Sequence, residues 1–88
     1  MSHQPPDDRR LLVTLFAGMA EAAGRRWVEL DWEGGTVREL RSRVASACPA
    51  IEPLLARSAV AIGDRYAAEA DTVPHDAEVA IIPPVSGG

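Results

Sequence analysis

Lysine is absent from this sequence, and all nine of its basic side chains are arginines. The arginines are scattered along the 88 residues, and acidic residues outnumber them to give a net charge of -4. A nucleic-acid-binding domain usually presents a basic patch or stripe. The composition therefore argues against a nucleic-acid partner and favours a partner with a basic surface.

Cysteine is scarce, and long apolar runs are missing. Cys48 is the single cysteine, so an internal disulfide is excluded. The sequence shows neither a signal peptide nor an apolar run long enough to cross a membrane. These absences predict a protein of the reducing cytoplasm that has no membrane partner.

Residues that could act as nucleophiles or metal ligands are few. Cys48 stands at the end of an expected helix with no histidine close in sequence, which favours a small buried thiol over a nucleophile. His75 lies in an expected turn, and the other histidine, His3, lies near the start of the chain. Two separated histidines do not make a ligand set, so no metal site is predicted.

The chain is also short. A domain of this size removes only roughly 60% of its unfolded surface from water. Its interior is therefore too small to enclose both a deep pocket and a full set of catalytic residues. Length therefore favours a carrier or binding module with no catalytic residues of its own. We expect a disordered tail at 1–9, a folded domain at 10–82 and an extended tail at 83–88.

Short apolar or alternating segments predict strands separated by turns. The alanine-rich stretch 17–23 predicts a short helix that ends at Gly24, because glycine readily adopts a left-handed conformation. Gly63 and Asp64 predict a hairpin loop. The predicted strands are 11–16, 27–32, 58–62, 65–67 and 78–82.

A longer helix is predicted to begin at Thr36. Thr36 and Glu39 have the spacing of a capping box, in which each side chain satisfies a free backbone N–H of the first turn. Pro49 is expected to end this helix, with a short helical turn at 53–55 after it. The predicted apolar stripe of the helix is Val37, Leu40, Val44 and Ala47.

One amphipathic helix among several strands indicates a two-layer α+β fold. The expected arrangement is the ubiquitin-like β-grasp, in which a mixed sheet packs on one main helix plus a short helix. The phase of the strands places Leu11, Val13 and Leu15 toward the helix, and Phe16 and Ile82 outward. Tyr66, across the hairpin, could join them in an exposed apolar cluster. We interpret Phe16, Tyr66 and Ile82 as a partner-binding patch, although capping of the core edge would also explain them.

The final residues of the sequence are chemically distinctive. Two prolines hold the chain extended, and two glycines, which lack a Cβ, can enter a narrow channel. A terminal glycine carboxylate can be activated by ATP as a mixed anhydride. We therefore expect a stiff stalk with a reactive tip at Gly88. The tail that would enter partner active sites is Pro83, Pro84, Val85, Ser86, Gly87 and Gly88.

Several segments between Leu11 and Gly88 carry a family resemblance. They are Phe16-Ala17, Gly24, Thr36-Val37, Val60-Ala61-Ile62, Asp71-Thr72 and the run from Glu78 to Gly88. The Pro-Pro-Val-Ser stem before the two glycines is the most specific of these. On these residues the chain resembles the small subunit of molybdopterin synthase, a MoaD-type ubiquitin-like sulfur carrier of the MoaD/ThiS family.

The resemblance implies a cycle of reactions at Gly88. An E1-like adenylyltransferase (MoeB-type) would adenylate its carboxylate with ATP and magnesium, and a sulfur donor would then replace AMP to leave a thiocarboxylate. The carrier would dock on the large synthase subunit (MoaE-type), in an expected heterotetramer, and give sulfur to cyclic pyranopterin monophosphate to build the molybdopterin dithiolene. Catalytic groups would belong to the large subunit, and the carrier would bind no cofactor itself.

Three other functions remain open. A sulfur carrier for thiamine or cysteine biosynthesis would form the same thiocarboxylate and meet a different acceptor. A ubiquitin-like protein modifier would conjugate Gly88 to amines on target proteins. A plain β-grasp interaction domain would have an inert tail, in which case deletion of Gly88 would cause no loss of function.

Overall fold

The computed structural model describes residues 10–84. The predicted disordered tail, 1–9, lies outside the described residues, and so do positions 85–88 of the predicted extended tail. None of the helices between residues 10 and 84 combines the length and the apolar character that a membrane crossing requires.

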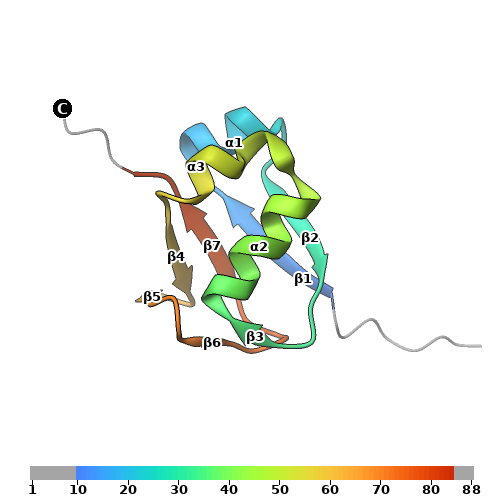
Figure 1. Ribbon diagram of the computed structural model, residues 1–88, viewed down its shortest axis with the longest axis vertical. Coiled ribbons are helices and arrows are strands. Elements are labelled where there is room, and N and C mark those ends of the chain that lie inside the picture. The colour runs from blue at the N-terminus through green and yellow to red at the C-terminus, as the bar shows by residue number, and fades with distance from the viewer. Residues whose placement is uncertain (1–9, 85–88) are drawn as a thin grey trace, which may run out of the picture.

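The main sheet has five strands in the order β2-β1-β7-β4-β5 (Figure 1). Its central strand, β7, pairs in parallel with β1 and antiparallel with β4. The outer pairs, β1 with β2 and β4 with β5, are antiparallel hairpin-like pairs. The strands are β1 (Arg10–Leu15), β2 (Trp27–Asp31), β4 (Ala59–Ile62), β5 (Arg65–Ala67) and β7 (Val79–Ile82).

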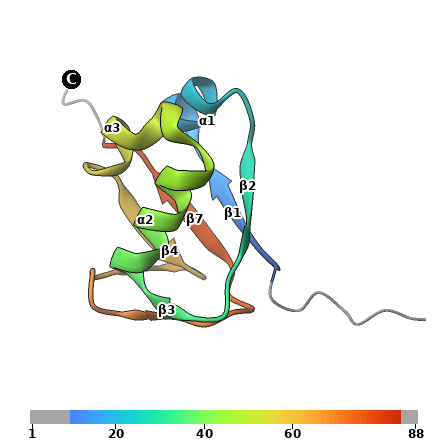
Figure 2. The same cartoon turned by 45° about the vertical axis from the view of Figure 1, so that its right-hand side comes forward.

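Helices cover one face of this sheet and leave the other face open. The longest, α2 (Val37–Ala47), crosses the sheet, and the shorter α1 (Ala17–Ala23) and α3 (Glu52–Leu55) lie at one end of the same layer (Figures 1 and 2). A mixed sheet with one main helix is the predicted α+β, β-grasp arrangement, and the structure confirms it.

The hydrophobic core lies between α2 and the covered face of the sheet. Alternate residues of each long strand point into it, as the predicted phase requires. Leu11, Val13 and Leu15 of β1 are buried, and so are Val79 and Ile81 of β7. The helices contribute Met19, Val37, Leu40, Val44, Ile51 and Leu55.

The predicted capping box is present at the start of α2. The Thr36 N–H donates to Glu39 Oε1 at 2.8 Å, and the Glu39 N–H donates to Thr36 Oγ1 at 3.2 Å. The predicted stripe is wrong at Ala47, which is exposed, whereas Cys48 is buried. The helix ends at Ala47, and Cys48 leaves the helical conformation with φ -143°, which turns its side chain toward the core.

The chain stays helical for longer after α2 than the sequence indicated. Pro49 ends α2 but opens a 3-10 turn, η1 (Pro49–Ile51), which leads directly into α3. Proline fits the first turn of a helix because that position needs no N–H donor. The predicted turn at 53–55 is therefore the end of a longer segment that buries Ile51 and Leu55.

A small second sheet closes one end of the core and was not predicted. It pairs β3 (Gly35–Thr36) with β6 (Thr72–Val73). Trp32, just after β2, is buried and donates its indole N–H to the Val73 carbonyl at 2.9 Å. Trp27, at the other end of β2, is exposed.

Glycines shape two of the predicted turns. Gly24 caps α1 in the left-handed conformation with φ 73°, and its N–H donates to the Ala20 carbonyl at 2.9 Å. Gly63 begins the β4–β5 turn with φ 65°, a value that favours glycine. The helix predicted at 17–23 is confirmed as α1, whereas the first strand was predicted to reach Phe16 but ends at Leu15, and Phe16 is the N-cap of the helix.

Candidate docking site beside the central strand

The central strand leads directly to the proline pair. β7 ends at Ile82, and Pro83 and Pro84 follow, with Pro84 exposed. The Phe16 N–H donates to the Ile81 carbonyl at 3.3 Å, which ties the end of β1 to the end of β7. The side chains of Phe16 and Ile82 are therefore held beside the point where the chain leaves the sheet.

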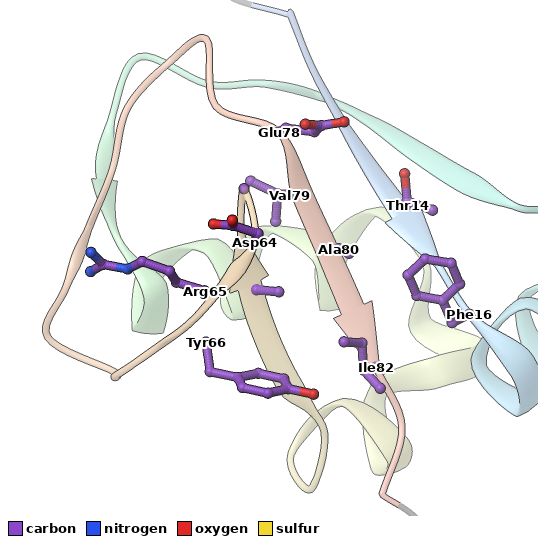
Figure 3. Close-up of a pocket in the computed structure, with 11 residues that line it drawn as sticks. Thr14, Phe16, Asp64, Arg65, Tyr66, Glu78, Val79, Ala80 and Ile82 are labelled. Carbon is purple, nitrogen blue, oxygen red and sulfur yellow. The ribbon is translucent and has the colours of Figure 1, made fainter.

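The three residues of the predicted patch line a single hollow on the open face of the sheet. Phe16 is 46% exposed and Tyr66 is 72% exposed, while Ile82 is half-buried. The hollow has a volume of about 390 Å³. Figure 3 shows Phe16 on one side of β7, Tyr66 on the other and Ile82 between them.

Strand register explains why a hollow forms there. Ala80 of β7 lies between Thr14 of β1 and Ala61 of β4, and Tyr66 of β5 pairs with Ala61. Small side chains thus occupy the middle of the sheet, and an aromatic side chain stands at its margin. Side chains on one face of a sheet project from it side by side. Short side chains at the centre and a long one at the margin therefore leave a depression over the centre.

Charged groups surround this apolar floor. Asp64, Arg65 and Glu78 line the hollow at the end away from Ile82 (Figure 3). The Gly63 N–H donates to the Glu78 carbonyl at 2.8 Å, which fixes the hairpin turn against the start of β7. An apolar centre with a polar rim is the usual composition of a protein-binding surface.

The other residues considered from the sequence lie away from this hollow. Cys48 is buried at the end of α2, and His75 is exposed in the turn before β7. Within residues 10–84 there is no group of three or more histidine, cysteine or acidic side chains placed to hold a metal ion. Neither Cys48 nor His75 lines the hollow, and its acidic side chains are those of Asp64 and Glu78.

Sequence reasoning missed part of the lining. Thr14 and Ala80 have the same outward phase as Phe16 and Ile82, so alternation alone could have identified them. Ala61, the turn residue Asp64 and Arg65 of β5 join the site through the pairing of β4 with β7. That pairing joins segments distant in sequence, and local pattern does not specify it.

Comparisons with known proteins agree with the fold. The protein-family model described as the ThiS family matches residues 13–88. The crystal structure of the small archaeal modifier protein 1 from Haloferax volcanii is 31% identical in sequence, with a TM-score of 0.78. The match covers 90% of this chain and 99% of that chain.

Two more distant structures share the fold. The solution structure of small archaeal modifier protein 1 from Methanosarcina acetivorans is 23% identical, with a TM-score of 0.74, over 90% of this chain and 96% of that chain. A Pyrococcus furiosus protein provisionally assigned as molybdopterin converting factor, subunit 1, is 22% identical, with a TM-score of 0.73. That match covers 86% of this chain and 98% of the other.

Proposed function

Because this chain belongs to the ThiS family, we propose that it is a ubiquitin-like sulfur carrier whose cargo is attached to the Gly88 carboxylate. The observation that carries the proposal is the position of the docking hollow beside the exit of β7. The family model runs to residue 88, which supports Gly88 as the modified residue.

Two balanced steps would load the carrier. A carboxylate oxygen of Gly88 attacks the α-phosphate of ATP, and pyrophosphate leaves. Sulfide, or a donor group of equivalent oxidation state, then attacks the acyl carbon, and AMP leaves. The product is a thiocarboxylate whose sulfur is a softer and stronger nucleophile than the oxygen it replaces. An E1-like adenylyltransferase with magnesium would supply the groups for the first step.

The acceptor that we propose is cyclic pyranopterin monophosphate, in the active site of a molybdopterin synthase large subunit. The chain would then be the small subunit of a heterotetramer in molybdenum cofactor biosynthesis in the cytoplasm. The stem Pro83, Pro84, Val85 and Ser86 would lead Gly87 and Gly88 into that site. The Pro-Pro-Val-Ser sequence of the stem supports this acceptor over those of thiamine or cysteine biosynthesis.

Docking would use the hollow lined by Phe16, Tyr66 and Ile82. These side chains are apolar, and Phe16 and Tyr66 are exposed, so partner binding would remove them from water. β7 lies at the centre of the sheet and is hydrogen-bonded to a strand on each side. The position at which the stalk leaves the domain is therefore fixed by the sheet. A partner that recognises the hollow would therefore receive the tail at a defined position.

The loading step is tested by the intact mass of the full chain after incubation with an E1-like adenylyltransferase, ATP, magnesium and sodium sulfide. We expect a mass gain equal to the difference between sulfur and oxygen. A chain that lacks Gly88 is the control and should show no gain. A folded chain that stays unmodified by an enzyme that loads another ThiS-family carrier would overturn the proposal.

The docking step is tested by the affinity of the chain for the large synthase subunit. Phe16→Asp should weaken binding by about tenfold or more, because it buries a carboxylate without a partner. Leu12→Asp is a matched control, since Leu12 lies on β1, which leads into Phe16, and it has the same outward phase and similar exposure but does not line the hollow. Equal losses in the two variants would place docking elsewhere.

A protein modifier is the second candidate, and the 31% identity with small archaeal modifier protein 1 favours it. Gly88 would be adenylated in the same way, but a lysine amine of a target would displace the activating group and form an isopeptide bond. The sequence has no lysine, so this chain could not extend such conjugates on its own side chains. Covalent adducts that form with target proteins but not with sulfide would favour this candidate.

A further inference from the structure

The edge strand β2 presents backbone groups that no other strand uses. It pairs with β1 on one side, and within residues 10–84 no strand pairs with it on the other (Figure 2). The Leu15 N–H donates to the Arg26 carbonyl at 2.7 Å, so position 26 faces β1. Because direction alternates along an antiparallel ladder, positions 27, 29 and 31 direct their N–H and C=O groups to the free edge.

Two groups near this edge already have partners within the chain. Arg43 Nη2 of α2 donates to the Asp31 carbonyl at 2.7 Å. The Arg25 N–H donates to the Ala20 carbonyl at 3.2 Å. These contacts leave the stretch from Trp27 to Glu29 as the part of the edge that is open for pairing with another strand.

The side chains along this edge are basic at one end and acidic at the other, so two antiparallel copies of the edge have complementary charges. Arg25 and Arg26 precede Trp27, and Glu29 and Asp31 follow it. Arg25, Trp27 and Glu29 line one shallow hollow, and Trp27 is 55% exposed. An antiparallel copy would therefore bring its acidic end opposite the basic end of this strand.

We propose that the partner of this edge is a second copy of the chain, paired antiparallel through β2. In the proposed register, Trp27 lies opposite Glu29 of the second copy, and Arg25 lies opposite Asp31 of that copy. The N–H and C=O groups of Trp27 and Glu29 then satisfy one another across the interface. Arg25 and Asp31 form a cross-strand ion pair at each end.

Backbone hydrogen bonding and side-chain charge favour this register over the two adjacent registers. At each end the Arg25 N–H would face the Asp31 carbonyl of the other copy, and each of these groups is already satisfied within its own chain. The Asp31 N–H and the Arg25 carbonyl also face each other there and can pair. Shifting the register toward Asp31 places Glu29 of one copy opposite Glu29 of the other, and these like charges repel each other. A shift in the other direction leaves a Glu29 carbonyl opposite the occupied Arg25 N–H, and so without a donor.

The pairing would join the two sheets side by side with their open faces in the same direction. The docking hollow lies around β7, away from β2, so both hollows would stay accessible in the dimer. The contact is small compared with the roughly 1,200–2,000 Å² of stable interfaces, so the dimer is expected to be weak.

Sedimentation velocity of the full chain from about 10 µM to about 1 mM tests the proposal, since weak interfaces dissociate in this range. We expect a concentration-dependent monomer–dimer equilibrium. Arg25→Asp or Asp31→Arg alone should weaken the dimer by about tenfold, because each sets like charges opposite at both ends. The double variant should restore the dimer to within about threefold of the original affinity.

Controls separate this edge from other surfaces. Arg57→Asp changes the net charge by the same amount as Arg25→Asp, at an exposed position outside β2, and should leave dimerisation unchanged. Backbone hydrogen exchange should slow at Trp27 and Glu29 as concentration rises. A monomer at all concentrations, a dimer insensitive to the single variants, or a double variant without recovery would each overturn the proposal.

Discussion

The two faces of the main sheet differ although the same strands build both. On the face covered by α2, Val13, Val79 and Ile81 are almost completely buried. On the open face, every second residue of the same strands points to solvent, and Leu12 is 52% exposed. The difference shows that one strand can contribute stability through one set of side chains and binding surface through the other.

The largest predicted effect contrasts two adjacent isoleucines of β7. Ile81 is fully buried under the helices, whereas Ile82 is half-buried on the open face. Ile81→Ala should lower the free energy of unfolding by about 2–5 kcal/mol, because it leaves a cavity in the core. Ile82→Ala should lower it by less than about 1 kcal/mol. Urea unfolding measured by circular dichroism gives both values, and equal losses would contradict the contrast.

The two tryptophans provide an intermediate contrast. Trp32→Phe removes the donor of this buried hydrogen bond to the Val73 carbonyl and leaves space in the core where the larger indole was. We expect a loss of about 1–3 kcal/mol in the free energy of unfolding. Trp27→Phe alters an exposed side chain and should change this energy by no more than about 0.5 kcal/mol. Thermal unfolding of both variants under identical conditions provides the check, and a Trp27→Phe midpoint below that of Trp32→Phe would contradict it.

Two ion pairs give the smallest contrast. On the helical side, Arg41 bonds Glu69 at 2.8 Å and is largely shielded from solvent. On the open face, Arg10 and Glu29 also meet at 2.8 Å, but both side chains are half exposed. Glu69→Gln should cost about 1 kcal/mol, and Glu29→Gln about half of that or less, since solvent screens exposed pairs. Unfolding at low and high salt would measure both losses, which should be equal if exposure does not matter.

Local sequence pattern was sufficient for most elements. Alternation placed β1 and β7 with the correct faces, and the Thr36 and Glu39 pair identified the start of α2. Gly24 and Gly63 marked turns because both adopt positive φ. These features depend on residues close in the chain, so a single sequence specifies them.

The misses share a different cause. The β3–β6 pair joins residues 35–36 to 72–73, and neither segment is long enough to show alternation. Ala47 was expected inside the stripe, but the helix ends there and Cys48 occupies the buried position instead. Neither outcome follows from a local period, because the first depends on contact with a distant segment and the second on the backbone conformation that changes at Cys48.

The sequence by itself determined the secondary elements, the phase of each long strand and the chemistry of its final residues. Only the tertiary structure decided that Phe16, Tyr66 and Ile82 line one hollow, because that requires β1 and β4 to pair on either side of β7. It also decided that, within residues 10–84, β2 is an edge strand that pairs with another strand on one side alone. Strand pairing is a contact between segments far apart in the chain, and the period of a single strand contains no information about its neighbour.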